Sequence, residues 1–447
     1  MKKYFYGFGG LSYSIISQTV ANYFMFFATS VLGIKGTLVG IAIGISTIWD
    51  GVSDTIIGYI SDNRSMGVLG KRNGYMLLAT IGMAISNIVL WCVPLGISDG
   101  LKFVWILVSL LILETFNTMF STPYMALGNE IVSTDSERTT VGASNTIFYL
   151  LGMIASSVLM MIYLPSTDKY PIGQLNPSGY IKIAIVGSII CLISGLIASL
   201  FTITKPKFEP IKKSKFKLSI GGLWNNFTIA FKDKRVSKII WAYVLTSIAT
   251  VILCSVGLHF FTYSFFYKSS DIAILLLTLI IGTIISQPLW IFLAKRVSKK
   301  SALISGIIIT ILSIFAVIFI YLFRIELFES SFYLMIVAIL FCGMGSGAIY
   351  TLPTSIYGDA IMKISRDGSL NATYSSAMTF AGNMASSIAQ LIVGILLDII
   401  GFDGGATMQT LFVQTGLAII LFAGIQFSLI LATLIFSRYD GNFNSSH

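Results

Sequence analysis

The sequence predicts an all-α polytopic membrane protein with twelve transmembrane helices in two six-helix halves. Of its 447 residues, 55% are hydrophobic and 11% are charged, whereas roughly 25% of residues are charged in soluble globular proteins. Uncharged apolar runs of about 20 residues or more recur along the chain, and each can cross a hydrocarbon core about 30 Å thick. The runs are expected to be helices, because in lipid the backbone N–H and C=O groups must bond within the segment.

The first apolar run is expected to remain in the mature protein. It follows Lys2 and Lys3, is too long for the apolar region of a signal peptide and lacks a small-residue cleavage site. The predicted spans cover residues 6–33, 37–61, 74–96, 102–132, 140–164, 179–204, 238–267, 271–294, 301–323, 331–361, 372–400 and 409–437.

The basic residues indicate the orientation of the chain. The net charge is +10, and most of the 29 Lys and Arg gather in alternate loops, as the positive-inside rule describes. This predicts a multi-pass protein of the cell (plasma) membrane with both termini cytoplasmic. No nucleic-acid partner is expected, because the basic residues do not lie on one face interleaved with aromatic residues.

A basic segment, residues 205–237, divides the chain into two predicted halves, 1–204 and 238–447. Within it, residues 218–231 mix aromatic and polar side chains, which fits either a short interfacial helix or a solvated linker. A basic motif also follows the second span of each half, as Gly70-Lys71-Arg72 and as Lys295-Arg296 with Lys299-Lys300. The repeated motif and the division into six and six spans suit the major facilitator architecture.

Two carboxylates in the second span carry the clearest chemical signal. Asp50 and Asp54 are four residues apart and therefore project from one helix face. Burying a single carboxylate at the centre of a span costs about 2.5–3.5 kcal/mol on insertion scales. Some interaction must therefore offset the cost of burying two carboxylates. A monovalent metal cation bound by both carboxylates and the Ser53 hydroxyl would do so, and so would a shared proton. Pairing with Lys or Arg from other spans is the structural alternative, although the predicted cores contain few cations.

Three other acids lie in or near the spans. Glu114, in the fourth span, is either functional or directed at a small polar gap. Glu130 and Asp359 lie near predicted cytoplasmic helix ends, where capping or interhelical pairing is expected.

The remaining polar residues of the spans are almost all uncharged. They either join helices by hydrogen bonds or, with tyrosine side chains, line a cavity that would suit a neutral polyhydroxy solute. His259, the only histidine in a span, belongs either to such a cavity or to an interhelical hydrogen bond. The candidate substrate-binding residues are Ser14, Gln18, Asn22, Asn117, Ser121, Tyr124, Asn145, Tyr149, His259, Tyr350 and Asn383.

Several motifs resemble those of the glycoside-pentoside-hexuronide:cation symporters, the melibiose permease-like family of the major facilitator superfamily. The resemblance runs nearly end to end, and its specific part is the Trp-Asp-x-x-x-Asp element in the second span. The matching residues are Tyr6-Gly7-Phe8-Gly9, Trp49-Asp50 with Ser53-Asp54, Gly58, Gly70-Lys71, His259-Phe260-Phe261-Thr262-Tyr263 and Tyr374-Ser375.

The resemblance implies a Na⁺, Li⁺ or H⁺ site between the second and fourth spans, formed by Asp50, Ser53, Asp54 and Thr118. Ser53 replaces a usual Asn and is still an oxygen donor. The substrate side departs from the family pattern, because Ser14 and Ser121 stand where galactoside carriers have acidic residues. The coupling residues are therefore present, and the sugar-specific charges are missing.

These observations predict a cation-coupled symporter that carries a small neutral sugar or glycoside by alternating access. A carrier of a lysolipid or another amphiphile is the alternative within transport. An enzyme is not expected, because the sequence shows neither a metal-ligand set nor a nucleophile with a base. The expected partners are the substrate, a coupling cation and the bilayer, with no other cofactor, and a monomer is expected.

Overall fold

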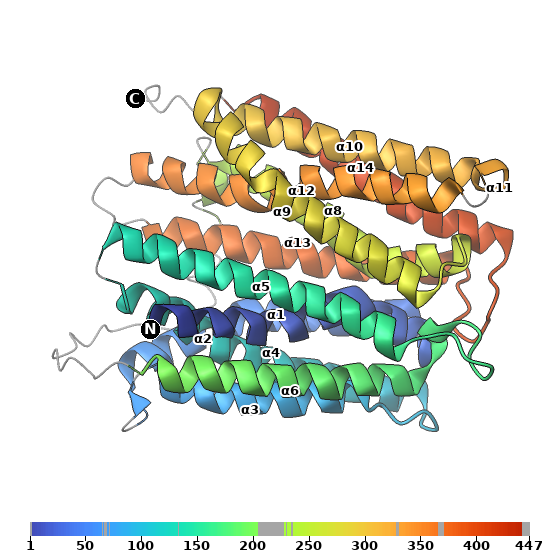
Figure 1. The fold of residues 1–447 in the computed structure, drawn as a ribbon, viewed down its shortest axis with the longest axis horizontal. Coiled ribbons are helices and arrows are strands. Elements are labelled where there is room, and N and C mark those ends of the chain that lie inside the picture. The colour runs from blue at the N-terminus through green and yellow to red at the C-terminus, as the bar shows by residue number, and fades with distance from the viewer. Residues whose placement is uncertain are drawn as a thin grey trace. The chain divides into compact units, whose positions relative to one another are not determined.

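The computed structural model is all-helical (Figure 1). It describes residues 2–439 except 65, 67–68, 71, 133, 204–227, 229, 234–235, 328–329 and 365–370, and no strand occurs among the described residues. The chain divides into two compact units. The first contains Met1–Leu218 with the short segments Lys268–Ser270 and Asp403–Thr407, and the second contains Ser219–Tyr267, Asp271–Phe402 and Met408–His447.

Within the described residues, eleven helices are long and apolar enough to cross a membrane. The first helix, α1 (Lys2–Phe26), has 25 residues and is also long enough, since a helix rises about 1.5 Å per residue. These helices account for the twelve predicted spans. The eleven are α2 (Gly36–Asn63), α3 (Asn73–Trp91), α4 (Asp99–Glu130), α5 (Asp135–Tyr163), α6 (Pro177–Phe201), α8 (Ser237–Ser264), α9 (Ser269–Arg296), α10 (Lys299–Leu322), α12 (Ser330–Ile364), α13 (Asn371–Ile399) and α14 (Leu411–Ser437). Short helical segments include η1 (Phe27–Val31), η3 (Gly173–Leu175) and α11 (Arg324–Leu327).

Several helix starts follow directly from the sequence. The Thr134 hydroxyl accepts a hydrogen bond from the backbone N–H of Glu137 at the start of α5. Ser298 and Thr410 cap α10 and α14 in the same way. Such side-chain oxygens satisfy N–H groups that have no partner within the helix.

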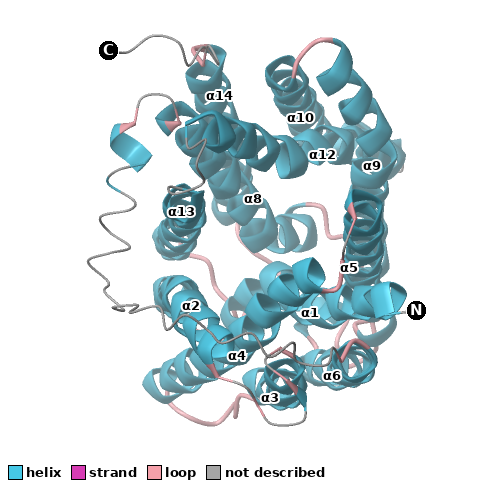
Figure 2. Cartoon of the chain, turned by 90° about the vertical axis from the view of Figure 1, so that its left-hand side faces the viewer, coloured by secondary structure: helices cyan, strands magenta, loops and turns pink. Residues whose placement is uncertain are grey.

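In the first unit, α1 packs against α5 and α6, and α3 packs against α4 and α6 (Figures 1 and 2). The glycines near the start of α1 permit close packing on α5. A Cβ atom at Gly10 would lie 2.6 Å from Asn145 Oδ1 and 2.7 Å from the Asn145 backbone oxygen. Any larger residue at Gly10 would therefore push α1 away from α5.

The first span changes its helix type before it ends. We expected one helix over residues 6–33, but α1 continues as a π-helical turn, η1 (Phe27–Val31). Buried Lys102 donates a hydrogen bond from Nζ to the backbone oxygen of Leu32 at 2.9 Å. The lysine thus satisfies a carbonyl at the end of this helix that would otherwise have no intrahelical partner.

The second unit repeats the helix pairings of the first. Helix α8 packs against α13 and α14, as α1 packs against α5 and α6. Helix α10 packs against α12 and α14, as α3 packs against α4 and α6. This correspondence is what two related six-helix halves require.

An ion pair also recurs at equivalent places. Arg72, just before α3, lies 2.9 Å from Glu130 at the end of α4. Lys299, at the start of α10, lies 2.5 Å from Asp359 near the end of α12. The expected interhelical pairing of both acids is therefore found. The linker boundaries 205 and 237 and the interfacial helix over 218–231 fall mainly outside the described residues and stay predictions.

Candidate cation site and polar side chains

The candidate cation site lies between α2 and α4, and three hydrogen bonds fix the register of these helices. Trp49 Nε1 donates to Thr115 Oγ1 at 2.8 Å. Next along the chain, Thr118 Oγ1 donates to Asp50 Oδ1 at 2.9 Å. One turn further along both helices, Thr122 Oγ1 donates to Asp54 Oδ1 at 3.0 Å. The sequence separations are 66, 68 and 68 residues, so the two helices run in the same direction with nearly constant register.

Asp50, Ser53 and Thr118 form a compact oxygen cluster. Ser53 Oγ lies 2.9 Å from Thr118 Oγ1 and 3.1 Å from the backbone oxygen of Asp50. The side chains of Ser53 and Thr118 are 3% and 1% exposed. Two buried hydroxyl oxygens are thereby held beside a carboxylate that is itself partly buried.

Asp54 lies one helical turn from Asp50 on the same face of α2. Both aspartates accept hydrogen bonds from threonine hydroxyls of α4. Helix α2 thus supplies the two carboxylates, and α4 holds them in orientation. Carboxylate and hydroxyl oxygens are hard ligands of the kind that small hard cations prefer. Among the described residues, no group of three or more His, Cys, Asp or Glu is arranged to hold a metal ion. Two carboxylates with hydroxyls beside them thus form a donor set made of oxygen atoms.

Glu114 and Asn117 adjoin this cluster on α4. Asn117 Nδ2 donates to Glu114 Oε2 at 3.1 Å. Asn117 Oδ1 is buried and has no hydrogen-bond partner within the part of the chain that the structure describes. Glu114 is close enough to Asp50 for their carboxylates to interact electrostatically, which places a third acid near the pair.

Ser14, Gln18 and Tyr149 connect α1 to α5. Ser14 Oγ donates to the backbone oxygen of Tyr149 at 2.6 Å, and Gln18 Nε2 donates to the Tyr149 hydroxyl at 3.1 Å. Ser14 is fully buried. These bonds match the helix-joining alternative for these residues.

Tyr124 and Asn145 belong to a second contact of the same kind, which includes Tyr6. The Tyr124 hydroxyl lies 2.7 Å from Asn145 Oδ1 and 2.9 Å from the backbone oxygen of Tyr6. The rings of Tyr6 and Tyr124 stack with centroids 4.2 Å apart. Gly9 permits this packing, because a Cβ there would lie 2.3 Å from the Tyr124 ring.

Two further candidates of the first unit, Asn22 on α1 and Ser121 on α4, are partly buried. Ser121 precedes Thr122, the residue that bonds to Asp54. Ser121 therefore lies at the level of the candidate cation site along α4.

The candidates of the second unit lie on three helices. His259, on α8, is fully buried, with Nδ1 3.0 Å from the backbone oxygen of Ser255 and its ring edge-on to Phe402. Tyr350, on α12, is 52% exposed. Asn383, on α13, is partly buried, and its backbone oxygen accepts the Ser387 hydroxyl. His259 is thus a packed core residue, whereas Tyr350 is accessible.

A group of ionic contacts at the C-terminal end of α2 involves Arg72. Its Nη1 lies 2.6 Å from Asp62 Oδ1 and 3.0 Å from Ser61 Oγ. Its Nε donates to Glu130 Oε1 at 2.9 Å. Arg72 is only 12% exposed and joins the ends of α2 and α4, the same two helices that form the candidate cation site.

Sequence reasoning missed Thr115 and Thr122. A signal was present, because Thr115, Thr118 and Thr122 are spaced three and four residues apart and so share one face of α4. The four-residue step from Thr118 to Thr122 equals the step from Asp50 to Asp54 on α2. It identifies α4 as the partner of the acidic helix.

The repeated helix pairings and the multiple spans define a polytopic membrane transporter of the major facilitator class. The chain belongs to the family described as MFS/sugar transport protein, which matches residues 5–442.

Three individual proteins illustrate the similarity. The chain is 22% identical to the sodium-dependent lysophosphatidylcholine symporter 1 of Xenopus tropicalis, over 98% of this chain and 86% of that protein. It is 24% identical to the isoprimeverose transporter of Lactiplantibacillus pentosus, over 67% of this chain and 60% of that one. A crystal structure of a variant of the nucleoside transporter NupG matches with a TM-score of 0.68 at 13% identity, covering 98% of this chain and 100% of that chain. At this identity the solved structure supports the fold alone.

Proposed function

We propose that the protein is a symporter that couples the movement of a solute to a cation, Na⁺, Li⁺ or H⁺, bound between α2 and α4. The observation that carries this proposal is the oxygen cluster of Asp50, Ser53 and Thr118, with Asp54 one turn away. Carboxylates within a membrane span are expensive, and a bound cation offsets that cost. The sodium-dependent lysophosphatidylcholine symporters among the relatives support the same reading.

In this proposal, the cation offsets one of the two negative charges of the aspartates and weakens their mutual repulsion, and so favours the loaded carrier over the more negatively charged empty one. The carrier then moves its solute by alternating access. Coupling between the two ligands must be reciprocal: a cation that tightens solute binding is itself bound more tightly when the solute is present, by the same factor.

The first candidate solute is a small neutral sugar or glycoside. The family description and the isoprimeverose transporter support it. Accessible Tyr350 adds a ring face of the type that stacks on sugars. The sugar proposal is weakened by Ser14, Tyr124 and Asn145, whose polar groups are used in contacts between helices.

The second candidate solute is a lysophospholipid or another amphiphile. The sodium-dependent lysophosphatidylcholine symporters align with nearly the whole chain. An amphiphile also needs fewer hydrogen bonds from the spans than a sugar does, which agrees with the polar groups being occupied.

Coupling is tested by uptake into proteoliposomes with and without a Na⁺ gradient. We expect uphill accumulation only with the gradient and its loss in Asp54→Asn, because the amide cannot neutralise a cation. Asp168→Asn removes an exposed loop carboxylate and should leave uptake unchanged. Equal accumulation in wild type and Asp54→Asn, with or without Na⁺, would refute the coupling.

The solute is identified by thermal unfolding of the purified protein with isoprimeverose, xylose or lysophosphatidylcholine, each with Na⁺, Li⁺ or neither. A ligand that binds only the folded state stabilises it, by about 2.7 kcal/mol at a hundredfold excess over Kd. Stabilisation by a sugar alone supports the first candidate, and stabilisation by the lysolipid alone supports the second.

A further inference from the structure

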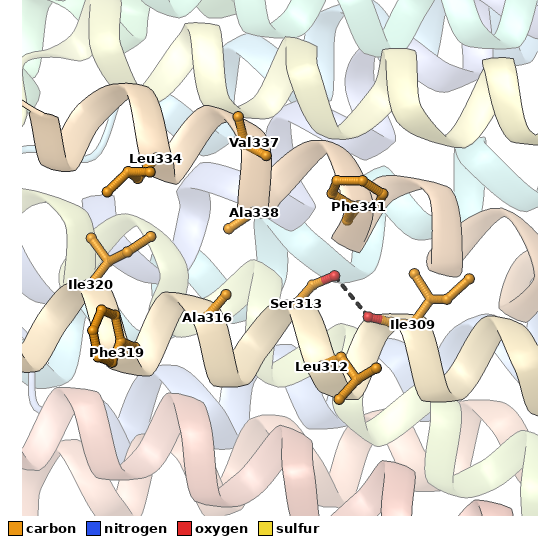
Figure 3. A pocket seen from close by; sticks show the side chains of 10 residues that line it. All are labelled: Ile309, Leu312, Ser313, Ala316, Phe319, Ile320, Leu334, Val337, Ala338 and Phe341. Carbon is orange, nitrogen blue, oxygen red and sulfur yellow. Dashed lines mark hydrogen bonds between the residues drawn. The ribbon is translucent and has the colours of Figure 1, made fainter.

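An apolar groove lies between α10 and α12 in the second unit. Its volume is about 720 Å³, and Figure 3 shows the side chains that line it. Ile309, Ala316 and Ile320 line it from α10, and Leu334, Ala338 and Phe341 line it from α12.

The groove exists because α10 and α12 approach closely at one level and separate at another. At the close level, a Cβ on Gly306 would lie 2.3 Å from the Ala348 side chain, and one on Gly345 would lie 2.2 Å from Thr310 Oγ1. Toward α11, no glycine pair draws the helices together. Ala316 and Ala338 are too small to fill the widening space between them (Figure 3).

The chemistry of the groove is that of hydrocarbon. Ser313 is the polar side chain among its lining residues, and its hydroxyl donates to the backbone oxygen of Ile309 at 2.7 Å (Figure 3). That bond satisfies the hydroxyl within its own helix. A polar occupant would lose its hydrogen bonds to water and find no replacement, so the groove selects an apolar chain.

The position of the groove agrees with a lipid tail. Both helices are long and apolar enough to span a membrane, and the lining residues Leu312, Phe319 and Val337 are 62%, 55% and 51% exposed. From Ile309 to Ile320 the helix rises about 16 Å at 1.5 Å per residue. One leaflet is half of a hydrocarbon core about 30 Å thick, so the groove is as long as one leaflet is deep.

A cationic side chain, that of Arg324, comes just after the α11 end of the groove. Arg324 comes one helical turn after Ile320 and is held in place by Tyr321, whose backbone oxygen accepts from Nη1 at 3.0 Å and whose ring centroid is 4.4 Å from Cζ. A guanidinium has five N–H donors in a fixed fork that suits phosphate. No carboxylate of the described residues forms an ion pair with Arg324.

We propose that this groove binds one acyl chain of a bilayer phospholipid, whose phosphate is bound by Arg324. The apolar lining fits the chain, the length fits one leaflet and the arginine fits the phosphate. This site is separate from the candidate cation site and from the transported solute.

The proposal is tested with a phosphatidylglycerol that carries a photoactivatable diazirine on one acyl chain. Purified full-length protein in nanodiscs is irradiated, and the labelled peptides are identified by mass spectrometry. We expect labelling of residues 309–341. Ala316→Phe, which fills the groove, should reduce this labelling at least about fivefold. Arg324→Gln should weaken binding of the phospholipid roughly tenfold, as expected for the loss of a charge-assisted hydrogen bond.

Matched variants control for general effects. Ile308→Phe enlarges an exposed residue of α10 outside the groove, and Lys169→Gln removes another cation that lies over a tyrosine ring. Both should label as wild type does. Ala338→Leu fills the groove from α12 and provides a second test if Ala316→Phe does not fold, which the thermal unfolding curve reports.

Three results would overturn the proposal. The first is equal labelling of wild type and both filled variants. The second is labelling that a matched lysophosphatidylcholine removes only during active transport, since the groove would then serve the solute. The third is a cross-linked dimer in place of lipid adducts, since a second copy would then cover this face.

Discussion

Replacing Thr118 by Val tests whether the hydroxyl between the two helices is a cation ligand. Thr118 lies 2.9 Å from both Asp50 Oδ1 and Ser53 Oγ and is 1% exposed. Val keeps the shape of the side chain and removes only the oxygen. The variant therefore changes the donor set without opening a cavity.

The magnitude follows from the contacts. A hydrogen bond to a charged group contributes about 1.5–3 kcal/mol. The lower value applies here, because the cation-free site also loses its bond to Asp50. Since each 1.4 kcal/mol is a factor of ten, we expect the apparent Kd for the coupling cation to rise roughly tenfold.

The assay is a Na⁺ titration of the melting temperature of the purified protein, repeated as a Na⁺ titration of solute uptake. Thr118→Ser keeps the hydroxyl and should bind nearly as wild type does. Thr115→Val is the control on the same face of α4, because Thr115 accepts from Trp49 and does not bond to either aspartate. An unchanged cation affinity in a folded Thr118→Val protein would refute the assigned role, as would an equal loss in Thr115→Val.

Two further predictions concern the ends and the packing of the helices. Arg72→Gln should lower the melting temperature, measured by thermal unfolding, more than Lys299→Gln does. Arg72 is 12% exposed and pairs with two acids, whereas Lys299 is 37% exposed. Equal decreases in melting temperature would contradict the idea that burial strengthens the ion pair. Gly343→Ala should destabilise the protein by about 1–3 kcal/mol through overpacking, because a Cβ there would lie 2.2 Å from the backbone oxygen of Leu279. Gly358→Ala is the control and should not destabilise it, because Gly358 has open space around it. Equal melting temperatures of the two variants would contradict the prediction.

The sequence alone predicted the number of spans well and their ends less well. Apolar length is a property of each segment, so the spans could be read one at a time. The π-helical turn η1 was not predicted, because it depends on contacts made from elsewhere in the chain, such as the one from Lys102 to Leu32. Helix type at a span end is a tertiary property.

The candidate cation site was partly accessible to sequence reasoning. Asp50 and Asp54 are conspicuous because charge is expensive in lipid, and Thr118 followed from the family resemblance. Thr122 was missed, because a threonine in a span carries no such penalty. Its importance appears only when α4 is placed beside α2 and its hydroxyl is found 3.0 Å from Asp54.

The roles of the uncharged polar residues in the spans could not be predicted from the sequence. Ser14, Tyr124 and Asn145 had two interpretations, a solute cavity or a contact between helices, and the sequence does not distinguish them because both need the same hydrogen-bonding groups. The structure shows these groups bonded to neighbouring helices. Composition and span length thus determined that this chain is a bundle of membrane helices with acidic residues in its spans, because the cost of placing a residue in lipid acts on each residue separately. The partner of each polar atom was decided by the tertiary structure, because a hydrogen bond requires two groups within about 3 Å of each other.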